Sequence, residues 1–323
     1  MENLEVLKSL NDAVTAIKDE IRKVIVGQDT VISEILIALF ADGHVLLEGV
    51  PGLAKTLMVS SLADVLDLKF NRIQFTPDLM PSDITGTDIL ATNSDGQRAF
   101  EYIRGPIFTN IVLADEINRT PPKTQAALLQ AMQEKQVSAG ITTYDLDPPF
   151  LVLATQNPIE QEGTYPLPEA QLDRFMFKIS IGYPSHSEEI EIVKTTTFGE
   201  RKQLKAILTA DTINKIQKSV REIPVSEHVL EYAVKLVRST RPNEEDAPDF
   251  IKKWVSWGAG PRASQFIVLA AKTKAAMDGR LTPSEKDVAD VATIVLRHRI
   301  LVSFAAQAEG MTSEDIITKL LGK

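Results

Sequence analysis

The chain has 323 residues, 44% of them hydrophobic, and is long enough to build one large domain or two ordinary ones. The absence of cysteine excludes a disulfide framework, a cysteine-ligated metal site and a thiol nucleophile. The formal net charge of −9 argues against general binding to a nucleic-acid backbone, because such binding relies on dense lysine and arginine.

The N-terminal region predicts two helices. In the first, apolar residues recur at steps of three and four: Leu7, Leu10, Val14, Ile17, Ile21 and Val24. This helix should stop near Val26-Gly27, and a second, apolar helix is expected over residues 31–41. The first five residues carry two acidic side chains, Glu2 and Glu5, where a signal peptide is basic, and the run 35–41 is too short to span a bilayer. We therefore expect a cytoplasmic protein without a transmembrane segment.

The segment 48–56 is the most informative part of the chain. It reads Glu-Gly-Val-Pro-Gly-Leu-Ala-Lys-Thr, between an apolar run and a helical pattern. A strand, a glycine-rich turn and a helix form the setting of a phosphate-binding loop, where backbone N–H groups and the helix N-terminus face phosphate oxygens. Lys55 would reach the outer phosphates, and the Thr56 hydroxyl would ligate Mg²⁺. The residues expected to contact the ligand are Gly49, Pro51, Gly52, Leu53, Ala54, Lys55, Thr56 and Leu57. Because Ala54 replaces the usual second glycine, an ordinary glycine-rich turn is the alternative.

The sequence predicts five strands. They lie near 45–48, 70–75, 111–115, 150–155 and 176–181, and they alternate with helical patterns up to about residue 183. Such alternation is typical of βαβ units, which build a parallel sheet.

The strand near 111–115 ends in two acidic residues, Asp115 and Glu116. Open α/β sheets bind ligands at the carboxyl ends of their strands. Asp115 is therefore expected to hold Mg²⁺ through water, and Glu116 to polarise an attacking water. A helix cap or a solvated loop is the alternative for this acidic pair.

Two later polar residues are further candidates. Asn157 follows the strand near 150–155 and is placed to hydrogen-bond the outermost phosphate or the attacking water; a turn before Pro158 is the alternative. Arg174 lies near the end of a short helix that should start at Pro168. It would stabilise transition-state charge at a neighbouring subunit's ligand, or else pair with an acid at the helix end.

Two insertions interrupt the alternating pattern. Residues 87–104 predict a β-hairpin with a turn at Asp95-Gly96, and residues 136–147 predict a second hairpin. Surface hairpins that serve only packing are the alternative to functional loops.

From His186 onward the sequence predicts helices only. The helical patterns cover 187–198, 211–221, 226–239, 262–278, 284–303 and 312–321, and the acidic stretch 244–249 predicts a solvated loop. Arg262 lies in the first turn of a long helix, where a cation opposes the helix dipole. This position suggests another use for Arg262, such as a phosphate contact.

These segments, in this order, resemble the MoxR family of AAA+ ATPases. The resemblance is carried by the loop 48–56, by Leu-Ala-Asp-Glu-Ile-Asn-Arg at 113–119 with 121–129, by the block 154–175 and by Val-Leu-Arg-His-Arg-Ile at 295–300. It implies an α/β fold: a five-stranded parallel-sheet P-loop AAA+ core with two β-hairpin insertions, followed by an all-α lid domain. The implied domains are a nucleotide-binding domain over 1–184, a linker with connecting helices over 185–225, and a lid over 226–323.

The resemblance also implies roles for single residues. Asp115 and Glu116 would form the Walker B pair, and Asn157 would be sensor 1. Arg174 would be the arginine finger and Arg262 sensor 2. Val26 and Gly27 would lie beside the adenine, which is compatible with a plain helix stop at Gly27. The hairpins would correspond to inserts that face the central pore in related motors.

The resulting expectation is Mg²⁺-dependent ATP hydrolysis by a homo-oligomer, a hexameric ring, that remodels, assembles or activates a partner protein complex. ATP and Mg²⁺ are the expected cofactors, and a protein carrying a von Willebrand factor A domain is an implied client. Nucleic acid is not expected as a partner because the chain is acidic. Two other functions stay open: a nucleic-acid-stimulated motor, since hairpin inserts also occur in helicase relatives, and a nucleotide-gated scaffold with little turnover.

Overall fold

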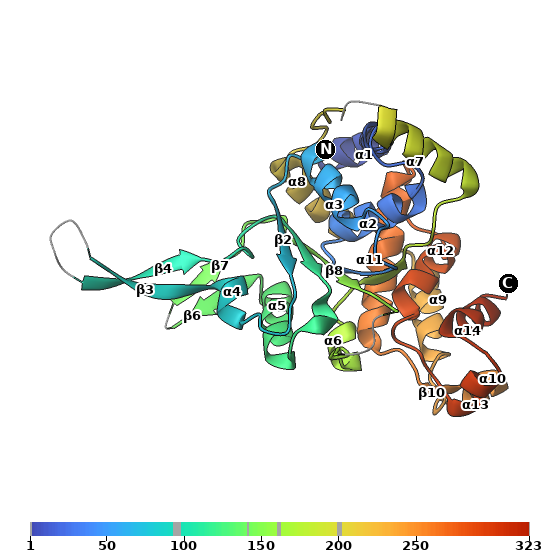
Figure 1. Ribbon diagram of the computed structural model, residues 1–323. Helices are drawn as coiled ribbons and strands as arrows, with labels where there is room; N and C mark the ends of the chain where they lie inside the picture. The colour runs from blue at the N-terminus through green and yellow to red at the C-terminus, as the bar shows by residue number, and fades with distance from the viewer. Residues whose placement is uncertain (1, 93–97, 141, 160–162, 199–201, 323) are drawn as a thin grey trace.

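The computed structural model describes residues 2–92, 98–140, 142–159, 163–198 and 202–322 (Figure 1). Within them, the predicted strands form a five-stranded parallel sheet in the order β2-β5-β8-β1-β9. The strands are β1 (Val45–Glu48), β2 (Phe70–Gln74), β5 (Ile111–Asp115), β8 (Leu151–Gln156) and β9 (Phe177–Ser180). Their carboxyl ends meet at one edge of the sheet, and the predicted parallel α/β core is confirmed.

The strands send alternate side chains to opposite faces of the sheet. In β5, Ile111 and Leu113 belong to one hydrophobic core, whereas Val112 and Ala114 belong to a second core on the other face. The first core includes α1 (Glu2–Ile21), α2 (Asp29–Phe40) and α3 (Lys55–Val65), and the second includes α5 (Pro122–Glu134). Burial on both faces explains why the central strands β1, β5 and β8 are nearly continuous apolar runs in the sequence.

The two insertions form an arm that projects from the body of the molecule (Figure 1). As predicted, they are antiparallel hairpins: β3 (Gly86–Thr92) with β4 (Arg98–Arg104), and β6 (Gln136–Ala139) with β7 (Thr142–Asp145). The rings of Tyr102 and Tyr144 stack with their centroids 4.4 Å apart, which holds the hairpins side by side. A short helix, α4 (Pro81–Thr85), leads into the arm. The turn predicted at Asp95-Gly96 lies outside the described residues.

The C-terminal half is helical, as predicted, apart from a two-stranded ribbon. Its helices are α7 (His186–Phe198), α8 (Ala210–Glu222), α9 (Glu227–Arg238), α10 (Asp249–Trp254), α11 (Pro261–Met277), α12 (Glu285–Leu296), α13 (Phe304–Ala308) and α14 (Ser313–Leu320). The helix predicted over 284–303 ends at Leu296, because β11 (Leu301–Val302) pairs with β10 (Val255–Trp257). Periodicity does not predict α10 and α13, since each is shorter than two helical turns.

The C-terminal helices belong to the same packed body as the sheet. Phe177 on β9, Ile267 on α11 and Val291 on α12 lie in one continuous hydrophobic core. Helix α1 packs against α8 and α11, and α12 packs against β9. Among the described residues, none of the helices combines the length and the hydrophobicity that crossing a bilayer requires.

Candidate functional site

The phosphate loop leaves the sheet at the carboxyl end of β1 and enters α3 at Lys55. Gly52 and Ala54 have left-handed backbone conformations, with φ of 87° and 53°. These conformations turn the chain tightly, so that the backbone passes from the strand into the first turn of the helix. Lys55 Nζ donates a 2.6 Å hydrogen bond to the carbonyl oxygen of Gly49, which keeps the ammonium group over the loop.

Asp115 ends β5 beside this loop, and its carboxylate is fixed from two sides. Oδ1 accepts a 2.6 Å hydrogen bond from the hydroxyl of Thr155 on β8. Oδ2 lies 2.6 Å from Nη2 of Arg72 on β2. Since β2 and β8 flank β5 in the sheet, the strand order itself brings these partners to Asp115.

Glu116 follows in a left-handed backbone conformation, with φ of 59°, so the chain turns sharply out of the strand. Its backbone N–H donates a 2.8 Å hydrogen bond to the Thr155 hydroxyl oxygen. Its Oε2 accepts a 2.9 Å hydrogen bond from Gln74 Nε2 and lies 3.2 Å from Nη1 of Arg119. The single Thr155 hydroxyl therefore positions both acidic residues.

The loop and the acidic pair surround one cavity of about 420 Å³. Its lining consists of Pro51, Gly52, Leu53, Ala54, Lys55, Thr56, Leu57, Arg72, Asp115, Glu116, Thr155 and Asn157. Burial lowers the pKa of Lys55, and the charges of Asp115 and Glu116 oppose this shift. Asn157 is 7% exposed, and its Oδ1 accepts a 3.1 Å hydrogen bond from the N–H of Ile159. A cavity with a cationic loop on one side and carboxylates on the other suits a phosphate group with its metal ion.

A second, more apolar cavity of about 150 Å³ shares Gly52, Leu53, Ala54 and Leu57 with the first. Val26 lines it, together with Ile192 on α7. Gly27 does not line it: a Cβ at Gly27 would lie 2.5 Å from Oε1 of Glu188. An apolar pocket that meets a phosphate cavity over the same loop suits a nucleotide, with the base in one part and the phosphates in the other.

Arg174 and Arg262 lie away from this cavity. Arg174 follows α6 (Glu169–Leu172), and its Nη1 donates a 2.8 Å hydrogen bond to the carbonyl oxygen of Leu129 on α5. Arg262, in the first turn of α11, lies 3.2 Å from Oδ2 of Asp173. Neither side chain lines the phosphate cavity of its own chain.

The residues present fit a nucleotide-bound Mg²⁺. Within the described parts of the chain, no three His, Cys, Asp or Glu side chains gather into a site of their own for a metal ion. Mg²⁺ usually keeps several waters and is held by one or two protein ligands together with substrate phosphates. Thr56 and Asp115 both line the cavity and offer that kind of partial ligand set.

Three residues of the site are not predicted from the sequence: Arg72, Gln74 and Thr155. Arg72 and Gln74 alternate with Ile73, which is buried, so the pattern indicates that both polar side chains share one face of β2. The sequence does not show that β2 lies next to β5, and that neighbourhood is what brings Arg72 and Gln74 to the acidic pair.

Comparison with known proteins gives the family. The profile of the ATPase family associated with various cellular activities (AAA) matches residues 44–177, and the AAA lid domain matches residues 251–320. Chaperone MoxR1 of Mycobacterium tuberculosis is 46% identical over 94% of this chain and 79% of that protein. Protein MoxR of Methylorubrum extorquens is 31% identical over 92% of this chain and 90% of that protein. The crystal structure of a protein from Cytophaga hutchinsonii, whose description proposes an ATPase, is 44% identical and superimposes with a TM-score of 0.91 over 99% of this chain and 96% of that one. The chain therefore belongs to the MoxR family of AAA+ ATPases.

Proposed function

We propose that the protein hydrolyses ATP with Mg²⁺ and, as an oligomer, uses this hydrolysis to remodel a partner protein. The observation that carries the proposal is the single cavity lined by Lys55, Thr56, Asp115, Glu116 and Asn157. Residues that are far apart in the sequence meet there at the ends of strands and helices. Phosphoryl transfer requires such a group of cationic, acidic and polar side chains around one phosphate. We propose that the protein works in the cytoplasm, where ATP and Mg²⁺ are available.

The proposed reaction is an in-line attack of water on the γ-phosphorus. The new bond joins the water oxygen to phosphorus, the bond to the bridging oxygen breaks, and ADP and phosphate leave. Glu116 and Asn157 orient the water, and Glu116 draws its proton. Lys55 stabilises negative charge on the outer phosphate oxygens. When bound beside Thr56 and Asp115, Mg²⁺ supplies further positive charge at the phosphates.

The proposed assembly is a hexameric ring in which Arg174 acts on the ATP of the next subunit. This arrangement agrees with the position of Arg174, which is half-buried against α5 and does not line the cavity of its own chain. Arg262 is proposed to reach the phosphates of its own subunit after it leaves Asp173.

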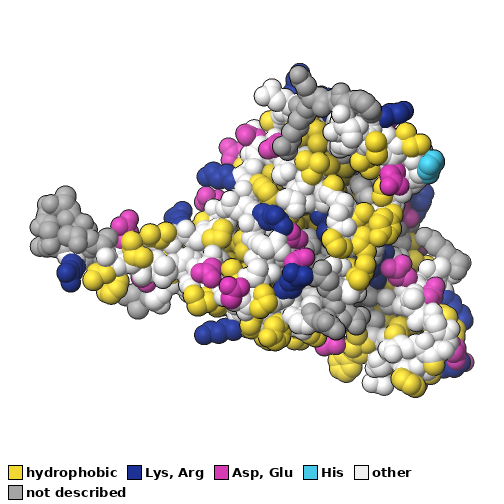
Figure 2. Space-filling view, viewed as in Figure 1, with side chains coloured by type: hydrophobic (Ala, Val, Ile, Leu, Met, Phe, Trp, Pro, Cys, Tyr) yellow, Lys and Arg dark blue, Asp and Glu magenta, His cyan; other side chains and the backbone are white. Residues whose placement is uncertain are grey.

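A protein client is proposed for two reasons. The relative from Mycobacterium tuberculosis is named a chaperone. In addition, the β3–β4 hairpin exposes large hydrophobic side chains (Figure 2), namely Ile89, Leu90, Phe100 and Ile103. A partner with a von Willebrand factor A domain is the specific client that we propose.

Lys55→Ala tests the nucleotide site. The change removes the main cationic contact to the phosphates, so the affinity for ATP and Mg²⁺ in titration calorimetry should fall at least about tenfold, the scale of a charged hydrogen bond. Lys69→Ala, at an exposed lysine before β2, is the matched control and should bind normally. Near wild-type affinity in Lys55→Ala would refute the assignment of the phosphate loop.

A further inference from the structure

Arg299 is a buried lid arginine that donates several hydrogen bonds to the nucleotide-binding core and one, from Nη1, to the carbonyl oxygen of Val295 on the preceding helix α12. It follows α12 and is 6% exposed. Its Nε donates to Asp173 Oδ1 at 2.8 Å. Its Nη2 donates to the carbonyl oxygens of Asp173 and Phe175 at 2.9 and 2.6 Å, and its Nη1 donates to that of Met176 at 3.2 Å. One guanidinium group thus binds Asp173 before Arg174, and Phe175 and Met176 after it.

The charge of Arg299 is well compensated. Burial lowers its pKa to about 10, and Asp173 opposes this shift, so the side chain remains cationic at neutral pH. The guanidinium carbon also lies 5.2 Å from the ring centroid of Phe266 on α11, at cation–π distance. A planar fork that satisfies several fixed acceptors is rigid, and lysine cannot reproduce it.

The neighbouring lid residues strengthen the same connection. Arg262 shares the carboxylate of Asp173, with Nη1 3.2 Å from Oδ2. The Nε2 atom of His298 lies 3.2 Å from the carbonyl oxygen of Phe175. The side chains of Arg262 and Asp173 are each about one third exposed, so their ion pair contributes little to the attachment of the lid. The buried Arg299 is the firm link between the lid and segment 173–176.

We propose that Arg299 is a positioning residue that fixes segment 173–176 to the lid, and thereby places the Arg174 guanidinium for its action on the neighbouring subunit. The inference rests on the proposed role of Arg174 as a finger in trans. It makes the placement of the finger depend on the lid of the same subunit. A displacement of about 1 Å at a catalytic group can cost about a hundredfold in rate, so loss of the fork should be visible in turnover.

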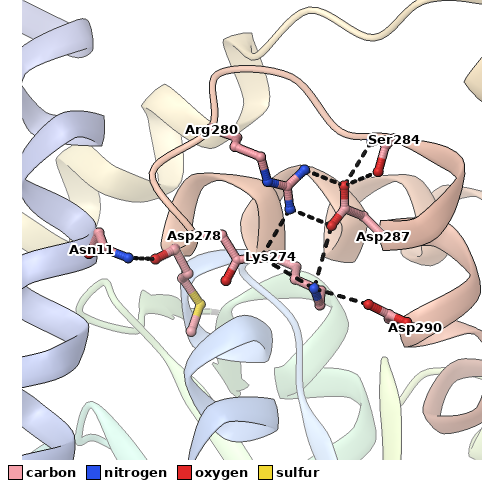
Figure 3. Close-up of polar contacts among 8 residues, drawn as sticks. Asn11, Lys274, Asp278, Arg280, Ser284, Asp287 and Asp290 are labelled. Atoms are coloured by element: carbon pink, nitrogen blue, oxygen red, sulfur yellow. Dashed lines mark hydrogen bonds and ion pairs between the residues drawn. The ribbon is translucent and has the colours of Figure 1, made fainter.

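The variant for the test is Arg299→Lys, which keeps a positive charge beside Asp173 but loses the planar fork. The matched control is Arg280→Lys (Figure 3). Arg280 is another lid arginine with a forked pair, in which Nη1 and Nη2 each lie 2.6 Å from an oxygen of Asp287. Asp287 is on α12, so this pair lies within the lid and does not touch segment 173–176.

The experiment mixes two inactive subunits. The donor carries Glu116→Gln, so it keeps Arg174 but lacks the residue that acts on water. The acceptor carries Arg174→Ala, so it keeps its own site but lacks the finger. Mixed assemblies, verified by co-purification through a tag on one subunit, should hydrolyse ATP where a donor finger faces an acceptor site. Arg299→Lys or Arg280→Lys is then added to the donor alone or to the acceptor alone.

The inference predicts an asymmetry. Arg299→Lys in the donor should lower the restored rate at saturating ATP at least about tenfold, whereas the same change in the acceptor should alter it less than about twofold. Arg280→Lys should alter the rate less than about twofold in either subunit. Equal losses in donor and acceptor would mean that Arg299 only supports the fold, and absence of any loss would overturn the inference as well.

A failure of the proposed role of Arg174 can be distinguished from a failure of the inference about Arg299. If the unmodified donor and acceptor restore no activity in assemblies that are shown to form, Arg174 does not act in trans, and the role of Arg299 falls with it. If Arg299→Lys does not fold by circular dichroism and thermal melting, Asp173→Asn replaces it. Asp173→Asn removes the charged acceptor of Arg299 and must show the same dependence on the donor.

Discussion

Thr155 is the residue that fixes the two carboxylates of the site relative to each other. It is 1% exposed on β8, and its hydroxyl donates to Asp115 Oδ1 while accepting the N–H of Glu116. The two bonds act on adjacent residues with different proposed tasks, metal binding and activation of water. We therefore expect the Thr155 hydroxyl to influence turnover although it need not contact the nucleotide.

Thr155→Val tests this role. Valine keeps the shape, but Asp115 loses a donor and the N–H of Glu116 loses its acceptor, so kcat should fall about tenfold and the free energy of unfolding by about 1–3 kcal/mol. Thr109→Val is the matched control: it is 3% exposed, and among the described residues its hydroxyl oxygen has no hydrogen-bond partner. Steady-state hydrolysis and urea denaturation of both variants measure the two effects. A normal kcat in Thr155→Val would show that the Thr155 hydroxyl does not influence turnover.

At the same scale, the sequence predicts the parts of the site that lie in one continuous motif. Lys55 and Thr56 follow from the strand–turn–helix pattern, and the acidic pair follows from the apolar run before it. Arg72 and Gln74 do not follow, because their contacts depend on β2 and β5 being neighbours in the sheet. They reach the acidic pair because β2 lies next to β5 in the sheet, and the residues of β2 alone do not show which strand is its neighbour.

At the scale of elements, the sequence predicts long segments well and their ends poorly. The apolar period of α12 continues beyond Leu296, yet the helix ends there. The residues after Leu296 make contacts outside the helix. His298 and Arg299 contact backbone carbonyl groups near β9, and residues 301–302 pair with β10. Tertiary contacts of this kind override periodicity, and they place the buried arginine that links the lid to the core.

Helix α2 carries an element-scale prediction about pH. Burial raises the pKa of Glu34 to about 7, and the charge of Arg297 lowers it in part. The folded protein therefore holds a proton on Glu34 that the unfolded chain releases near pH 4.5. The free energy of unfolding should accordingly decrease as the pH rises from about 4.5 to 7.

Glu34→Gln should remove this dependence, because glutamine does not titrate. Between pH 5 and pH 8, wild type should lose about 1–2 kcal/mol more unfolding free energy than the variant, after allowance for partial solvent exposure. Urea denaturation at both pH values measures this difference, with Glu231→Gln on the exposed face of α9 as control. Parallel pH profiles for wild type and Glu34→Gln would contradict the prediction.

At the scale of the whole molecule, core and lid are one packed body, and the arm projects from the core (Figure 1). Arg174 and the phosphate cavity lie on different parts of this body. A site that is completed by a neighbouring subunit is fully active only after the subunits assemble.

The rate of hydrolysis per subunit should rise with protein concentration until assembly is complete. An isolated subunit lacks the finger, and fingers contribute about 10³–10⁵ in rate in other P-loop enzymes, so the rise should be large. Parallel sedimentation velocity shows which concentrations contain oligomers. A rate per subunit that stays constant while the oligomeric state changes would rule out completion of the site by a neighbour.

The most direct test of ATP hydrolysis in the cavity between the phosphate loop and the acidic pair is to measure binding and turnover in one preparation of Glu116→Gln. Glutamine keeps the size of the side chain and leaves the loop intact, but it does not draw a proton from water. We predict ATP affinity within about twofold of wild type and hydrolysis reduced at least about a hundredfold. Hydrolysis at the wild-type rate with normal binding would contradict this prediction.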